Sequence, residues 1–168
     1  MALNPDENRP LGTIVDHFLR HPENFHFTFD HGNGHSREYP GLQLAREAAG
    51  LALKIREFGV KPGDRVVVVL PTSEPLIRVI LAAWFARAVI VVLPHRLAGS
   101  RSSSSAAKLQ RMLAKVAPKA AVGYREVEPV VRSALVEGQF YLAAEDLSDV
   151  PCAELDSALV PLPNDLAL

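Results

Sequence analysis

The stretch Phe58–Ser73, which reads FGVKPGDRVVVVLPTS, constrains the fold of this chain more than any other segment. Gly59 follows an apolar stretch with helical periodicity, at the position where a left-handed residue ends a helix. Lys61–Asp64 carries the proline and glycine of a tight turn. Val66–Leu70 is an unbroken apolar run, typical of a strand covered on both faces. Pro71 ends that strand, so the stretch predicts a helix, a turn, a buried parallel strand and a second helix.

Helical and strand patterns alternate along the rest of the chain. Alternating apolar residues in Phe25–Phe29, a Gly-rich turn and Ser36–Tyr39 predict a β-hairpin. The other expected elements are helices over Thr13–Arg20, Pro40–Phe58, Glu74–Phe85, Lys108–Val116 and Val127–Val136, strands over Val89–Leu93, Ala120–Val122 and Phe140–Leu142, and a loop over Pro94–Ser105.

This order predicts an α/β fold: a doubly wound, mainly parallel sheet flanked by helices, with a small N-terminal β-hairpin. We divide the chain into a flexible N-terminus over residues 1–10, an α/β unit over residues 11–150 and a Pro-rich tail over residues 151–168.

The bulk composition excludes several classes of protein. The formal net charge is -1 and Lys and Arg are spread along the chain, which argues against a nucleic-acid partner. The longest apolar stretch, Val79–Leu93, is interrupted by Arg87 and is shorter than a membrane span of about 20 residues. The N-terminus lacks the apolar core of a signal peptide. The single cysteine, Cys152, permits no internal disulfide, so we expect a cytoplasmic protein.

Four polar residues follow the carboxyl ends of two expected core strands. Thr72 and Ser73 follow the first strand, and His95 and Arg96 follow the second. Open α/β sheets bind ligands outside these ends, so we take the four residues as candidate substrate-binding residues. The alternative reading is structural: Ser73 caps the next helix and Arg96 is a solvated surface residue.

Three other sequence features give weaker indications of function. The Ser-rich segment Gly99–Ser105 precedes a helix but lacks the glycine spacing and Lys-Ser/Thr pair of a phosphate-binding loop, so we favour a surface loop. His31 and His35 lie in a turn with no further ligands nearby, and we predict no metal site. Cys152 has no adjacent base and is not expected to act as a nucleophile.

Several segments resemble the N-terminal part of adenylate-forming enzymes, the superfamily of acyl-CoA synthetases, fatty acyl-AMP ligases, luciferases and peptide-synthetase adenylation domains. The matching segments, in order, are Tyr39–Leu44, Ala45–Gly59, Lys61–Val66, Leu70–Ser73, Ala83–Arg96, Pro118–Val122 and Asn164–Leu168. The loop after Pro94 is most similar to the fatty acyl-AMP ligase branch. Two residues depart from the family pattern: Arg87 stands where the family usually has glycine, and Val92 where it has proline.

The resemblance implies an enzyme that uses ATP and Mg²⁺ to activate a carboxylic acid, such as a fatty acid, and transfers it to a thiol of CoA or a carrier protein. In the family the ATP loop and the catalytic lysine come later than a segment like Asn164–Leu168. We therefore expect no catalytic residue and no bound cofactor in this chain, with the remainder of an adenylation domain as its partner. The alternative is a non-catalytic interaction or regulatory module that self-associates through exposed apolar surface.

Overall fold

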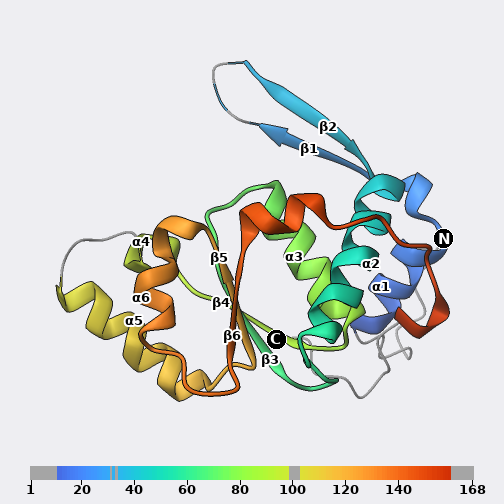
Figure 1. The fold of residues 1–168 in the computed structure, drawn as a ribbon. Helices are drawn as coiled ribbons and strands as arrows, with labels where there is room; N and C mark the ends of the chain where they lie inside the picture. The colour runs from blue at the N-terminus through green and yellow to red at the C-terminus, as the bar shows by residue number, and fades with distance from the viewer. Residues whose placement is uncertain (1–10, 31, 33, 99–102, 160–168) are drawn as a thin grey trace, which may run out of the picture.

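A four-stranded parallel sheet lies at the centre of the computed structural model, which describes residues 11–30, 32, 34–98 and 103–159 (Figure 1). The strands are β3 (Arg65–Val69), β4 (Val89–Val92), β5 (Ala120–Gly123) and β6 (Phe140–Ala143). Their spatial order is β4-β3-β5-β6, and every neighbouring pair is parallel. The chain therefore leaves β3 toward one edge and returns to its other side, which confirms the doubly wound sheet.

Helices cover both faces of the sheet because successive side chains of β3 point in opposite directions. Val66 and Val68 pack in one core with α1 (Leu11–Arg20), α2 (Gly41–Glu57) and α3 (Glu74–Phe85). Val67 and Val69 pack in a second core with α5 (Ser103–Val116) and α6 (Glu128–Arg132). Figure 1 shows these two helical layers on opposite sides of the sheet. None of the helices in the described ranges is long and apolar enough to cross a bilayer.

The N-terminal hairpin consists of β1 (His26–Asp30) and β2 (Ser36–Pro40), which pair antiparallel with Phe27 opposite Tyr39. A single 3-10 turn, η1 (Pro22–Asn24), precedes it. The hairpin projects from the start of α2 in Figure 1. Phe27 and Phe29 pack against the first core while His26 and Thr28 face outward, so the alternation in the sequence correctly predicts a half-buried strand.

Helices α2 and α3 end in the same way but with different residues. Gly59 has φ +85°, and its amide donates to the carbonyl of Arg56 at 2.9 Å. Arg87 has φ +60°, and its amide donates to the carbonyl of Trp84 at 2.8 Å. Both are left-handed helix ends of the Schellman type. The departure at Arg87 therefore preserves a backbone conformation that glycine adopts without steric cost.

Two predicted boundaries are wrong. The segment Pro94–Ser105 is not a continuous loop, because α4 (His95–Ala98) forms directly after β4 and α5 already begins at Ser103. The predicted helix Val127–Val136 shrinks to α6, preceded by the 3-10 turn η2 (Arg125–Val127). Serine and glycine favour loops in isolation, and here packing of Leu109 and Leu113 on the sheet extends the helix beyond the predicted start. His31 and residues 99–102 lie outside the described residues.

The chain after β6 crosses back to α2 as a strap, by which we mean residues 151–159. It follows the 3-10 segment η3 (Ala144–Asp149) and ends in η4 (Ser157–Leu159). The amide of Ala153 donates to the carbonyl of Arg46 at 3.0 Å. This approach requires glycine at position 50, because a Cβ there would lie 2.0 Å from the carbonyl oxygen of Pro151.

Candidate functional site

The carboxyl ends of β3 and β4 border an open pocket of about 530 Å³. Its wall is mainly apolar and has a few polar groups; it is lined by Leu70, Pro71, Thr72, Leu76, Val92, Leu93, Pro94, His95 and Arg96. This is the edge at which open parallel sheets bind ligands, and apolar pockets with a few fixed polar groups are typical of small-molecule sites.

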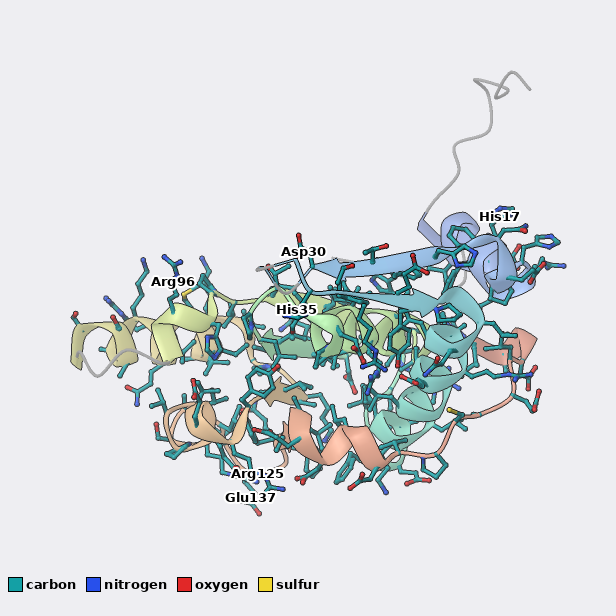
Figure 2. The ribbon with its side chains drawn as sticks, turned by 90° about the horizontal axis from the view of Figure 1, so that it is seen from above. His17, Asp30, His35, Arg96, Arg125 and Glu137 are labelled. Atoms are coloured by element: carbon teal, nitrogen blue, oxygen red, sulfur yellow. The ribbon has the colours of Figure 1, made fainter. Side chains whose placement is uncertain are left out.

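Three of the four residues singled out from the sequence line this pocket together. Thr72 comes from the loop after β3, while His95 and Arg96 open α4. Arg96 is exposed at the pocket rim, at the end of the molecule opposite His17 (Figure 2). Ser73 does not line the pocket.

Ser73 instead shapes the entry to α3. It occupies the N-cap position, yet its side chain forms no capping hydrogen bond. Its hydroxyl donates to the carbonyl oxygen of Pro71 at 2.9 Å and so braces the loop that carries Thr72. The capping interpretation of this hydroxyl is therefore wrong, and its role is to hold the pocket loop.

His95 extends the pocket toward the loop after β5. Its Nε2 lies 3.5 Å from a carboxylate oxygen of Glu126, and its ring meets Tyr124 edge-to-face with centroids 6.2 Å apart. The Nε2 atom is shielded from solvent and makes no hydrogen bond within the described part of the chain. A shielded ring nitrogen of this kind can accept or donate a hydrogen bond once a ligand or water reaches it.

Tyr124 and Glu126 were not identified from the sequence. Both residues lie in the segment after β5, as Thr72 lies in the loop after β3, so their position after a strand was visible in the sequence while their contact with His95 was not. The strand order places Tyr124 and Glu126 close to the pocket. Strand β5 lies next to β3, and the connections from these two strands leave toward opposite edges of the sheet. That reversal is where ligands bind in doubly wound sheets.

A second pocket, of about 340 Å³, is polar and joins the hairpin to α2 and α3. The hydroxyl of Tyr39 donates to Glu47 at 2.5 Å, and Arg78 lies 3.0 Å from Glu47 and 2.6 Å from Glu74. Arg37 adds a further ion pair to Glu74 at 3.1 Å.

Charge in this network is balanced, with two guanidinium groups against two carboxylates. Tyr39 is almost fully buried, and burial, reinforced by its hydrogen bond to Glu47, raises the pKa of its phenol above the ordinary range. Balanced and mutually bonded groups leave little free capacity for a ligand. We interpret the network as the tie that seats the hairpin on the body of the protein.

The described residues contain no cluster of three or more His, Cys, Asp or Glu side chains able to hold a metal ion. Cys152 is an exposed free thiol at the edge of the polar pocket. The arrangement at the carboxyl edge suits binding of an apolar group with a polar end, and it shows no nucleophile paired with a base.

Comparison with known proteins gives a consistent family and fold. A family model described as AMP-binding enzyme matches residues 16–160. A chain from structural and functional studies of the E. coli and L. pneumophila fatty acyl-adenylate ligases has a TM-score of 0.74 and 24% identity, over 99% of this chain and 29% of that one.

Two further structures extend the comparison. The L. pneumophila fatty acyl-adenylate ligase in complex with acyl adenylate and pyrophosphate has a TM-score of 0.69 and 21% identity, over 99% of this chain and 29% of that one. McyG A-PCP complexed with phenylalanyl-adenylate has a TM-score of 0.72 and 16% identity, over 89% and 24%. No curated protein matches the sequence. The chain thus spans less than a third of these solved chains.

Proposed function

Because the chain belongs to the AMP-binding enzyme family, we propose that it is the N-terminal part of an adenylate-forming ligase that activates a carboxylic acid. In that reaction a carboxylate oxygen attacks the α-phosphorus of ATP, the bond to the β-phosphate breaks, and an acyl adenylate and pyrophosphate form. A thiol then attacks the acyl carbon, and AMP leaves with the electron pair of the broken C–O bond. The single observation that carries this proposal is the family match over residues 16–160.

In this proposal the chain alone has a structural role and does not catalyse the reaction. Its described residues offer neither a metal-ligand cluster nor an activated nucleophile, and it corresponds to about 29% of the fatty acyl-adenylate ligase chains. ATP and Mg²⁺ belong to the larger enzyme, and we expect neither to be bound productively by these 168 residues.

The acid in this proposal is a fatty acid. Its support is the apolar wall of the carboxyl-edge pocket, which Thr72, His95 and Arg96 also line, and the fatty acyl-adenylate ligases among the similar structures. An apolar wall favours a hydrocarbon chain through burial, and a guanidinium at the rim favours a carboxylate. The acceptor is the thiol of CoA or of a carrier protein, and the compartment is the cytoplasm.

ATP–pyrophosphate exchange tests the proposal. The 168-residue chain is assayed alone and together with a polypeptide that supplies the remaining part of an adenylation domain, with saturated fatty acids and amino acids as substrates. We expect no exchange by the chain alone and fatty-acid-dependent exchange by the combination. Exchange by the chain alone would overturn the scaffold assignment. No exchange in either case would favour the non-catalytic interaction module.

A further inference from the structure

The net charge of -1 conceals an uneven distribution of the acidic residues along the chain. Residues 75–125 form a run of 51 positions without a single Asp or Glu, and this run carries nine of the 18 Lys and Arg residues. All 19 acidic residues lie outside it, so the run has a formal charge of +9 and the rest of the chain -10. Interspersed charges of both signs are the norm for a solvated surface.

Within this run, α5 concentrates cations that have no partner. Lys108, Arg111 and Lys115 recur at helical spacing and therefore share one face of α5. All three side chains are exposed, and none has an ion pair or hydrogen bond to the part of the chain that the structure describes. We call this set the α5 basic face.

Most Lys and Arg side chains elsewhere in the described ranges form an ion pair or a hydrogen bond. Arg20 pairs with Asp16, Lys54 with Glu57, and Arg132 with Glu128, each three or four residues along a helix. The α5 basic face lacks such pairing because the helix contains no acidic residue at all. In Figure 1, α5 lies at the outer side of the molecule, remote from α1 and α2.

We propose that the α5 basic face docks a folded protein partner that presents a helix with acidic side chains at matching spacing. The three cations extend over seven residues, or about 10 Å of helix, so they form a line rather than converging on one point. A single phosphate group needs converging donors, whereas carboxylates one turn apart on a facing helix match a line. Ala107 and Ala114, exposed and seven residues apart on the neighbouring strip of α5, let a partner helix approach closely.

The same charge map disfavours a nucleic acid as the occupant. Arg78 and Arg125, which belong to the same run but lie outside α5, are already paired with carboxylates, so a long polyanion would gain little beyond the α5 basic face. A compact acidic domain needs only the α5 basic face, and opposite potentials would steer its approach. The inference is independent of the proposed ligase function, because it depends on the distribution of charge and on the exposure of α5.

The experiment uses the full chain and a synthetic helical peptide of about 20 residues. The peptide carries Glu at i, i+4 and i+7, is labelled with a fluorophore, and has a Gln-substituted copy as its control. Fluorescence anisotropy is measured for the native chain and for a triple variant, Lys108→Glu, Arg111→Glu and Lys115→Glu. Arg46→Glu, at another exposed helical cation, is the control for a charge reversal outside α5, and circular dichroism checks that all variants are folded.

We expect the Glu peptide to bind at least tenfold more tightly than the Gln peptide, and the triple variant to lose that preference, consistent with about 0.5 kcal/mol or more per pair. Arg46→Glu should bind like the native chain. Raising NaCl from about 50 to about 500 mM should weaken binding. Equal binding of both peptides, binding unchanged by the triple variant, or tighter binding of a DNA duplex of similar length would each overturn the proposal.

Discussion

The amide of Gly63 donates a hydrogen bond to the carbonyl oxygen of Arg87 at 2.9 Å. This contact joins the turn before β3 to the end of α3, and the amide of Val89 makes a similar bond to Asp64 at 2.8 Å. The left-handed conformation of Arg87 aims its carbonyl at the turn. A non-glycine residue in this conformation thus makes a backbone contact that links the turn before β3 to the segment before β4.

Arg87→Gly should stabilise the protein. A non-glycine residue in the left-handed region costs about 1–2 kcal/mol, of which the greater backbone freedom of glycine in the unfolded chain offsets a part. We expect the free energy of unfolding to rise by about 1 kcal/mol in urea titrations. Arg87→Ala, which removes the side chain but keeps the conformational cost, is the control. A stability gain in Arg87→Ala equal to that in Arg87→Gly would place the effect in the side chain.

Gly50→Ala should detach the strap. The added Cβ would lie 2.0 Å from the Pro151 carbonyl oxygen, so residues near Pro151 must move away. Alanine favours the helix by about 1 kcal/mol, so α2 itself should persist. Limited proteolysis should then cut within residues 151–159 much faster than in the native chain. Leu53→Ala, at an exposed position of the same helix, should leave the cleavage rate unchanged.

Val92→Pro should be tolerated. The amides of Val89 and Leu93 donate toward β3, so the alternation of the strand points the Val92 amide to the open edge of the sheet. Proline is accepted at edge positions whose N–H faces outward. We expect a change in the free energy of unfolding within about 1 kcal/mol. Val91→Pro, which removes an inward-facing donor, should cost about 3 kcal/mol or more.

Stability should fall at alkaline pH. Burial raises the pKa of Tyr39 and of Tyr141 above the ordinary tyrosine value of about 10. A raised folded-state pKa means that the folded protein holds the phenol proton more tightly than the unfolded chain does. This stabilisation is fully present below about pH 10 and is lost as the pH rises toward the folded-state values.

Urea titrations between pH 8 and about pH 11 measure this loss. The native chain should show a midpoint that decreases steadily above about pH 9.5. The variant Tyr39→Phe, Tyr141→Phe should begin from a lower midpoint and show a shallower decrease. A slope unchanged in the double variant would assign the alkaline loss to other groups.

Sequence patterns predict the layers of this fold well, because a strand or helix that is buried on two faces has an almost continuous apolar sequence. The valine run of β3 and the nearly all-apolar stretch of α3 predict both elements to within a residue, and Gly59 marks the end of α2. The short helix α4 has no recognisable sequence pattern, since four residues are too few to show a helical periodicity. The contact between His95 and Glu126 could not be predicted from the sequence either. It depends on β5 lying beside β3, and local sequence patterns do not determine the order of strands.

The role of Val92 could not be predicted from its residue type alone. From the sequence, Val92 was identified only as a residue that stands where the family has proline. The structure places Val92 at the rim of the pocket and at an open sheet edge, with 46% of its surface exposed. Its side chain therefore forms part of the pocket wall, a role that depends on the fold around it.

Gly50 has a practical consequence for dividing this protein. The Arg46 carbonyl accepts its bond from Ala153, and Leu159 at the end of the strap is 3% exposed. An excision after residue 150 would strip one wall from the first core and leave apolar surface open to aggregation. A graft or fusion that ends beyond Leu159 keeps the wall in place, which makes the strap, rather than the last strand, the natural limit for transplanting this unit.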